Sequence, residues 1–297
     1  MRCAAVKWPG FLGLLLLLLV AERLPAQGLQ PRLREQATPP KTKEKFKLYL
    51  LVGQSNMAGR GAVEAQDTVP NRRVLRLNKE GVWEIAKDPV HFDKAAAGVG
   101  PGLTFGKTLA GLDTSVVIGL VPCAVGGSGI NVWQPGAFYA ATNTNPYDDA
   151  IRRAKAAMQS GTLAGIIWHQ GESDSKPDLS SAYGKNLTEL IARFRRDLQS
   201  PDVPFVAGQL PEFQFVQQDS VGKQHVNAAA IRVNEAVARL KKTVPHYDYV
   251  TAEGTRDRGD KLHFDAVSAR LMGRRYALAM KALQQKNAKD RSRVKVK

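Results

Sequence analysis

The chain has 297 residues, of which 43% are hydrophobic, so it suits one large α/β domain or two small ones and not a disordered chain. Its formal net charge of +16 favours polyanions through long-range attraction. No zinc-finger, helix-turn-helix or aromatic RNA-binding signature accompanies this charge, and we therefore expect no nucleic-acid partner.

Residues 1–26 are predicted to be a secretory signal peptide. Arg2 and Lys7 form a basic start, a run with six consecutive leucines follows, and Leu24-Pro25-Ala26 matches a cleavage site. The alternative is an uncleaved membrane anchor, but the apolar run is shorter than the roughly 20 residues that a spanning helix needs. We therefore expect a secreted or periplasmic protein with no membrane span after cleavage.

Cleavage would leave Cys123 as the single cysteine of the mature chain, so no internal disulfide can form. An exported protein without disulfides fits a bacterial envelope better than an animal secretory pathway, where disulfides are common. Cys123 follows an apolar strand and is interpreted as a packed thiol, with a nucleophile as the alternative.

Much of the positive charge lies near the ends of the chain. Residues 27–45 form a basic, proline-containing linker, and residues 286–297 form a tail with six basic residues against Asp290. We predict that both segments are solvated and poorly ordered, flank one domain at residues 46–285, and make weak contacts with anionic polymers of the cell envelope.

After the linker, apolar β-rich runs alternate with amphipathic helical stretches, which predicts an α/β fold with a parallel sheet covered by helices on both faces. The less regular segment Asn71–Gly102 is interpreted as an insertion over one edge of the sheet. In chain order we expect strand Phe46–Val52, short strands Val74–Leu77 and Val82–Ala86, helix Leu103–Leu112, strand Ser115–Val121, helix Pro146–Gln159, strand Ala164–His169, helix Leu179–Leu198, strand Val203–Leu210, helix Gln224–Lys242, strand Tyr247–Thr251 and helix Asp265–Gln285.

Polar, glycine-rich stretches follow several of these strands. In an open sheet of this kind, ligands bind beyond the carboxyl ends of the strands, so the convergence of such stretches predicts a site there. The stretches are Gly53–Asn56, Pro122–Ser128, His169–Asp174 and, after the last strand, Gly259–His263.

Ser55 follows a strand through Gly53 and precedes a segment that can begin a helix. This placement exposes the hydroxyl while the Ser55 backbone N–H faces the same point, as a nucleophilic serine requires. From its position alone, Ser55 is equally well interpreted as the cap of a helix.

Asp260 precedes His263 by three residues, just before a predicted helix. At this spacing the carboxylate can hold one imidazole nitrogen while the other faces a nucleophile. A surface histidine near a helix start is the alternative, and the pair becomes the better hypothesis only together with Ser55.

Other residues at the strand ends are candidates for the oxyanion hole or for support. The Gln170 side chain, or a backbone N–H of Gly126 or Gly127, can donate to an oxyanion, although the glycines also fit ordinary turn geometry. Glu172 and Asp174 can hold their loop, and one of them can orient a histidine.

Metal and cofactor chemistry has little support in the sequence. His169, Glu172 and Asp174 are mixed ligands without a His-Glu-x-x-His helix or paired cysteines, and Gly126–Gly129 lacks the ending of a P-loop. We therefore expect no metal and no organic cofactor. Trp133 fits a sugar-binding cleft and core packing about equally well.

Three stretches together resemble the SGNH hydrolase superfamily, and within it the sialate O-acetylesterase and acetylxylan esterase group, which is similar to carbohydrate esterase family 6. The stretches are Gly53–Met57, His169–Asp174 and Asp260–Phe264, within a resemblance that covers about Lys47–Leu283. It implies a three-layer α/β/α sandwich of flavodoxin-like type, in agreement with the alternation of strands and helices.

The resemblance implies that Ser55 is the nucleophile, His263 the general base and Asp260 its orienting carboxylate. The Ser55 amide, Gly126 or Gly127, and the Gln170 side chain would form the oxyanion hole, where the wider superfamily has an asparagine in place of the Gln170–Glu172 stretch. The implied activity is removal of O-acetyl groups from acetylxylan or related acetylated sugars through an acetyl-enzyme intermediate. The alternatives are sialate O-acetylesterase activity and a non-catalytic carbohydrate-binding protein of the envelope on the same scaffold. The residues that support the site in this interpretation are Gln54, Asn56, Glu172 and Asp174.

Overall fold

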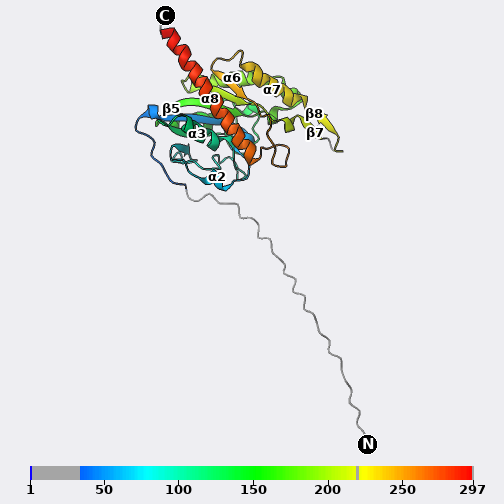
Figure 1. The fold of residues 1–297 in the computed structure, drawn as a ribbon. Coiled ribbons are helices and arrows are strands. Elements are labelled where there is room, and N and C mark those ends of the chain that lie inside the picture. The colour runs from blue at the N-terminus through cyan, green and yellow to red at the C-terminus, as the bar shows by residue number, and fades with distance from the viewer. Residues whose placement is uncertain (2–33, 219–220, 296–297) are drawn as a thin grey trace. The chain divides into compact units, whose positions relative to one another are not determined.

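The computed structural model describes Met1 and residues 34–295, apart from residues 219–220 (Figure 1). The predicted signal peptide at residues 1–26 therefore lies outside the described residues, except for Met1. No helix in the described part of the chain is long and apolar enough to cross a membrane.

The fold is built on a sheet of seven strands in the order β3-β2-β4-β1-β5-β6-β9, and all neighbours are parallel except the antiparallel pair β2 and β3. The predicted parallel sheet is confirmed. The segment interpreted as an insertion contributes two strands to one edge of the sheet. The strands are β1 (Phe46–Gly53), β2 (Val74–Leu77), β3 (Trp83–Ile85), β4 (Val117–Pro122), β5 (Thr162–His169), β6 (Phe205–Gly208) and β9 (Tyr247–Val250).

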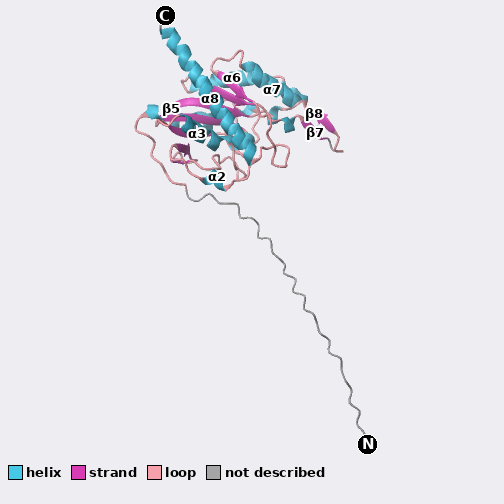
Figure 2. Cartoon of the chain, viewed as in Figure 1, coloured by secondary structure: helices cyan, strands magenta, loops and turns pink. Residues whose placement is uncertain are grey.

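Helices cover both faces of the sheet, so the fold is the expected three-layer α/β/α sandwich (Figure 2). Alternate side chains of β1 point to opposite faces, as in any strand. Leu48 and Leu50 pack with the residues of one helical layer, and Tyr49 and Leu51 pack with the other. The first layer holds α4 (Pro146–Ala157), α6 (Tyr183–Asp197) and α7 (Ala228–Leu240), and the second holds α3 (Pro101–Leu112) and α8 (Ala266–Lys295).

The remaining elements are short. The helix predicted at Leu179–Leu198 is divided into α5 and α6. The helix predicted from Gln224 begins at Ala228, because Gln224–Val226 pairs with Val216–Gln218 in a hairpin that projects from the fold (Figure 1). These elements are η1 (Lys43–Lys45), α1 (Ser55–Ala58), α2 (Ala65–Thr68), η2 (Ile130–Val132), η3 (Glu172–Asp174), α5 (Pro177–Ser180), η4 (Glu212–Gln214), β7 (Val216–Gln218) and β8 (Gln224–Val226).

The described parts of both flanking segments, residues 34–45 and 286–295, differ from the poorly ordered ends expected from their charge. Within residues 34–45, the Ala37 N–H donates to the carbonyl of Trp83, and the Arg34 guanidinium donates to backbone carbonyls at Lys87 and Pro89. The segment predicted as a tail continues α8 as far as Lys295, and Asn287 within it is buried. Pairing with the sheet edge and helix continuation outweigh the charge of these segments.

Helices α3 and α8 lie unusually close together. A Cβ atom at Gly273 on α8 would stand 2.5 Å from the carbonyl oxygen of Pro101 on α3, so only glycine allows this approach. Because α8 follows directly after the polar stretch Gly259–His263, this contact fixes where that stretch lies.

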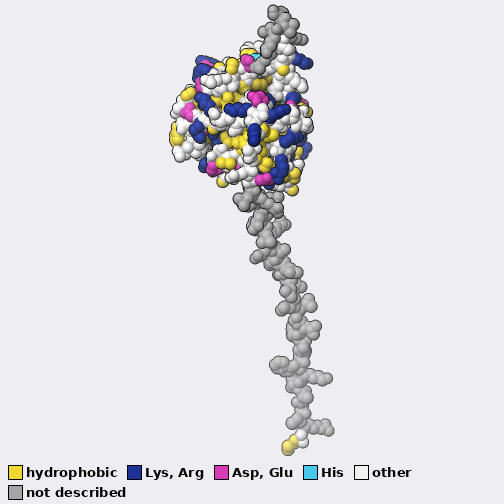
Figure 3. Space-filling view, turned by 90° about the vertical axis from the view of Figure 1, so that its left-hand side faces the viewer, with side chains coloured by type: hydrophobic (Ala, Val, Ile, Leu, Met, Phe, Trp, Pro, Cys, Tyr) yellow, Lys and Arg dark blue, Asp and Glu magenta, His cyan; other side chains and the backbone are white. Residues whose placement is uncertain are grey.

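On the face seen in Figure 3, Lys and Arg side chains are scattered among apolar ones and outnumber Asp and Glu.

Candidate active site

Strand β1 ends in a turn that only glycine can make. Gly53 has a φ of +127°, and a Cβ atom there would lie 2.1 Å from the carbonyl oxygen of His169 on β5. The next residue, Gln54, donates its N–H to that carbonyl at 2.9 Å, and α1 then begins at Ser55. The turn thus places the Ser55 side chain beyond the carboxyl ends of β1 and β5.

The structure brings Ser55, His263 and Asp260 into one hydrogen-bonded row. The His263 Nε2 atom lies 3.1 Å from Ser55 Oγ, and His263 Nδ1 lies 2.8 Å from Asp260 Oδ2. Since an ionised carboxylate only accepts hydrogen bonds, Nδ1 carries the proton and Nε2 is left to accept from the serine hydroxyl. This is the arrangement that activates a serine for attack.

Asp260 is held as a carboxylate by its own turn. Partial burial alone would raise its pKa, but hydrogen bonds from the His263 backbone N–H and imidazole and from the Leu262 N–H lower the pKa below its ordinary value. The Arg258 Nε atom, 3.6 Å from Asp260 Oδ2, adds a favourable charge. Asp260 therefore stays ionised at neutral pH.

Asn56 connects the nucleophile turn with the histidine turn. Its Nδ2 donates to the carbonyl of Leu262 at 3.1 Å, and its Oδ1 accepts from the N–H of Phe264 at 3.0 Å, so the two residues beside His263 are both held. The same Nδ2 donates to Glu172 Oε1 at 2.6 Å. Asn56 thus contacts both residues that flank His263, and Glu172 contacts Asn56.

Glu172 is an unusual carboxyl group. Burial raises its pKa to about 7, although the hydrogen bond from Asn56 opposes the shift. Its Oε2 atom is buried without a hydrogen-bond partner among the described residues, which agrees with a group that is protonated for part of the neutral range. Asp174, whose pKa is also raised by burial, accepts from the N–H of Ile130 at 2.9 Å.

The Gln170 side chain is hydrogen-bonded within the fold, so the geometry does not support its predicted place in the oxyanion hole. Gln170 is fully buried, and its Nε2 donates to Asp174 Oδ2, to Gln54 Oε1 at 3.1 Å and to the carbonyl of Ser128 at 3.4 Å. These three acceptors fix the orientation of the amide and leave it no hydrogen for a substrate. Gln170 and Gln54 therefore connect the turns after β1, β4 and β5.

Of the two glycines that are candidate backbone donors to the oxyanion, Gly126 and Gly127, the geometry favours Gly127. The Gly126 N–H donates to Asp93 Oδ2 at 2.9 Å, so Gly126 cannot serve an oxyanion without losing that bond. Among the described residues, no acceptor faces the Gly127 N–H or the Ser55 N–H at the start of α1. Gly127 has a φ of +87°, and its carbonyl accepts from Ser173 Oγ at 3.0 Å.

Asp93, Arg60 and Ser173 are supporting residues that sequence reasoning missed. Arg60 forms a buried ion pair with Asp93 at 2.8 Å, and both side chains lie where a Cβ atom on Gly126 would stand. Asp93 lies in an irregular segment with no motif around it, so no local signal identifies it. Ser173 lies inside the third polar stretch, where it could have been proposed from its position.

Three other residues considered in the sequence analysis, Trp133, Cys123 and His169, pack inside the fold. Trp133 is fully buried, packs edge-to-face on Trp168 with ring centroids 5.1 Å apart and donates to Ser128, so it belongs to the core. Burial raises the pKa of Cys123 to about 11, which suits a packed thiol. Burial lowers the pKa of His169 to about 3, and His169 contacts the hydroxyl of Tyr276. The described residues contain no group of three metal-ligating side chains.

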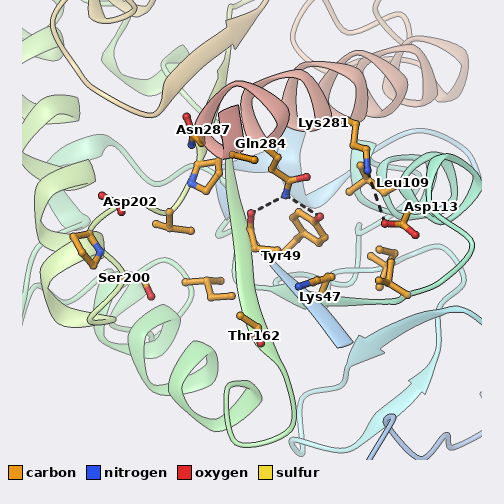
Figure 4. Close-up of a pocket in the computed structure, with 18 residues that line it drawn as sticks. Lys47, Tyr49, Leu109, Asp113, Thr162, Ser200, Asp202, Lys281, Gln284 and Asn287 are labelled. Atoms are coloured by element: carbon orange, nitrogen blue, oxygen red, sulfur yellow. Dashed lines mark hydrogen bonds and ion pairs between the residues drawn. The ribbon is translucent and has the colours of Figure 1, made fainter. Parts of the chain in front are cut away.

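A pocket of about 480 Å³ lies at the opposite edge of the sheet, where the strands begin (Figure 4). Gln284 of α8 crosses it, donating to the hydroxyl of Tyr49 at 3.1 Å and to the carbonyl of Ala164 at 2.9 Å. None of the candidate site residues lines this pocket, so it is separate from the row of Ser55, His263 and Asp260.

Comparison with known proteins agrees with this geometry. Residues 45–282 match the family described as "Carbohydrate esterase, sialic acid-specific acetylesterase". A probable carbohydrate esterase from Arabidopsis thaliana is 36% identical over 181 residues, which cover 54% of this chain and 66% of that protein, just under two thirds.

Solved structures share the fold. A protein of Arabidopsis thaliana superposes with a TM-score of 0.67 at 29% identity, covering 80% of this chain and 98% of that one. A carbohydrate acetylesterase from Xanthomonas citri gives 0.61 at 21% identity over 81% and 57% of the two chains, and NanS gives 0.62 at 16% identity over 84% and 99%. The match over residues 45–282 means that this chain belongs to the sialic acid-specific acetylesterase family of carbohydrate esterases.

Proposed function

We propose that this protein is a serine esterase that removes O-acetyl groups from carbohydrates through an acetyl-enzyme intermediate. The observation that carries the proposal is the row of Asp260, His263 and Ser55, with distances of 2.8 Å and 3.1 Å between successive polar atoms. Membership of a carbohydrate esterase family supports the substrate class.

In the first half of the reaction, Ser55 Oγ attacks the acetyl carbonyl while His263 Nε2 accepts the hydroxyl proton. The carbonyl oxygen becomes an oxyanion, for which the backbone N–H groups of Ser55 and Gly127 are the donors. His263 then gives its proton to the sugar oxygen, the ester bond breaks, and Ser55 keeps the acetyl group.

In the second half, water attacks the acetyl carbonyl and gives its proton to His263 Nε2. The same two N–H groups stabilise the second oxyanion, acetic acid leaves, and the proton returns from His263 to Ser55 Oγ. The Asp260 carboxylate stabilises the imidazolium in both halves. The scheme uses no metal ion and no organic cofactor.

For the sugar, we propose acetylxylan or a related acetylated polysaccharide, with O-acetylated sialic acid as the second candidate. The description of the matched family favours the second. Both carry the same acetyl ester, so selectivity depends on the loops around Ser55.

The deciding experiment measures acetate release by residues 27–297 from 4-nitrophenyl acetate, acetylated xylan and O-acetylated sialic acid, beside Ser55→Ala. We expect Ser55→Ala to lower kcat by about 10⁶-fold. Turnover that survives the substitution would show that Ser55 is not the nucleophile. A folded wild-type chain with no Ser55-dependent release from any substrate would favour the alternative, a non-catalytic carbohydrate-binding protein on the same scaffold.

We also propose export from the cell, on the sequence of residues 1–26 alone. Expression of the full chain in a bacterium should yield a periplasmic or secreted protein beginning at Gln27. Mass spectrometry of the purified protein tests this, and a chain that keeps residues 1–26 and stays in the cytoplasm would refute it.

A further inference from the structure

The space beside Gly127, where a side chain would stand in any other residue, is bordered by a single side chain among the described residues. A Cβ atom placed on this glycine would lie 2.8 Å from the hydroxyl oxygen of Tyr139, with no other heavy atom outside the neighbouring residues within 4 Å. Since the Gly127 N–H is the proposed donor to the acetyl carbonyl, the Tyr139 hydroxyl lies beside the position that the ester would occupy.

Tyr139 is held in place by its own loop, between η2 and α4. Its N–H donates to the carbonyl of Thr144 at 2.8 Å. Asn145 Nδ2 donates to the carbonyl of Ala137 at 3.0 Å, and the Gly136 N–H donates to Asp148 Oδ2 at 2.8 Å. These bonds hold the loop backbone that carries the tyrosine before any substrate arrives, which lowers the cost of using it for binding.

The Tyr139 hydroxyl itself has no hydrogen-bond partner among the described residues, although its side chain is half-buried. Its neighbour Phe138 is 55% exposed. A phenol can both donate and accept a hydrogen bond, as sugar hydroxyls can, and an adjacent exposed ring offers a face to a pyranose.

We propose that the Tyr139 hydroxyl binds an oxygen of the sugar that carries the acetyl group, which makes Tyr139 a specificity-determining residue. The inference rests on the proposed function. With the carbonyl oxygen on the N–H groups of Ser55 and Gly127, the leaving sugar extends from the ester over the open face of Gly127. A nitrophenyl leaving group has no ring hydroxyl there for Tyr139 to bind.

The test is Tyr139→Phe, which removes one oxygen and keeps the ring. We expect kcat/KM to fall about 3- to 10-fold, the worth of one neutral hydrogen bond, for whichever sugar ester the wild type hydrolyses faster. The loss should lie mainly in KM, and kcat/KM for 4-nitrophenyl acetate should stay within about twofold. Tyr249→Phe is the control, since Tyr249 is also half-buried and lies on β9; it should change neither value.

Equal losses on the sugar ester and on 4-nitrophenyl acetate would place Tyr139 at the oxyanion and overturn the proposal, as would no loss on either. These outcomes are read only against the Ser55→Ala variant measured in parallel. Turnover that persists without the Ser55 hydroxyl would refute the proposed function, and this failure is distinct from that of Tyr139.

Discussion

The Asn56 side chain joins two parts of the candidate active site that lie 206 residues apart in the sequence. It holds the Leu262 carbonyl and the Phe264 N–H, and these residues flank the proposed general base. Asn56→Ala should therefore release the histidine turn and lower kcat by about 10²-fold, since small displacements of a catalytic group are costly. Steady-state kinetics with 4-nitrophenyl acetate measures this.

Asn78→Ala is a matched control for that variant. Asn78 is also buried and also bonds a backbone N–H and a carboxylate, but its partners are Val82 and Glu84, outside the site. Both variants should lose about 1–3 kcal/mol of stability. If both lose kcat equally, Asn56 acts through general stability and not by positioning His263.

Asp260→Asn should keep the turn but lose the carboxylate that stabilises the imidazolium. We expect kcat to fall by about 10²- to 10⁴-fold with little change in KM. Asp257→Asn is the comparison, because Asp257 lies in the same turn and accepts from the backbone N–H groups of Gly259 and Lys261, not from His263. A loss after Asp257→Asn as large as that after Asp260→Asn would contradict the assignment of Asp260.

Glu172 should make stability depend on pH. Its pKa of about 7 in the fold is above its ordinary value, so its contribution to stability is full at low pH and is lost as the pH rises through about 7. Glu172→Gln keeps an oxygen acceptor for Asn56 but does not titrate. The Tm of the wild type minus that of Glu172→Gln should therefore fall between about pH 5 and about pH 8. A difference that stays constant would show that Glu172 ionises normally.

Two glycines in helices should respond to alanine in opposite directions. Gly273→Ala on α8 would place a Cβ atom 2.5 Å from the Pro101 carbonyl, so it should destabilise the fold by about 1–3 kcal/mol. Gly111→Ala on α3 meets nothing within 4 Å and should stabilise it by about 0.5–1 kcal/mol, through helix propensity. Denaturant unfolding measures both, and equal signs would mean that the contact between α3 and α8 is not tight.

The elements that the sequence predicted well are those with strong, simple patterns. Continuous apolar runs such as Leu48–Val52 indicate a strand covered on both faces, and β1 lies at the centre of the sheet. The hairpin of β7 and β8 has no such pattern, since its strands are short and polar. Gln224–Val226 therefore looked like the first turn of the helix that follows it.

The candidate site was predictable from the sequence for residues that directly follow a strand or precede a helix. Ser55, Asp260 and His263 follow strands or precede a helix, so their placement at one sheet edge follows from topology. The role of Gln170 was not predictable in this way, because it depends on acceptors from three separate turns. Asp93 and Tyr139 come from irregular segments whose path only the tertiary structure determines.

The positive charge of the whole chain should act separately from catalysis. Lys286, Lys289 and Arg291 belong to the half of α8 remote from His263, which precedes the first turn of this helix. Replacing Lys286, Lys289 and Arg291 by glutamine keeps helix propensity and removes three charges. Retention on a heparin column should decrease, while kcat for 4-nitrophenyl acetate stays unchanged. Unchanged retention would show that the anion-binding charge lies elsewhere.

The separation of Ser55 from His263 by 208 residues has a consequence for how the enzyme is made. The proposed general base belongs to the segment that enters α8, which leaves the ribosome after every strand of the sheet. A nascent chain that has already folded β1 therefore carries a serine with no partner to deprotonate it. Esterase activity should arise only when α8 docks on α3, so a chain released early or held unfolded during transport would leave acetyl esters intact.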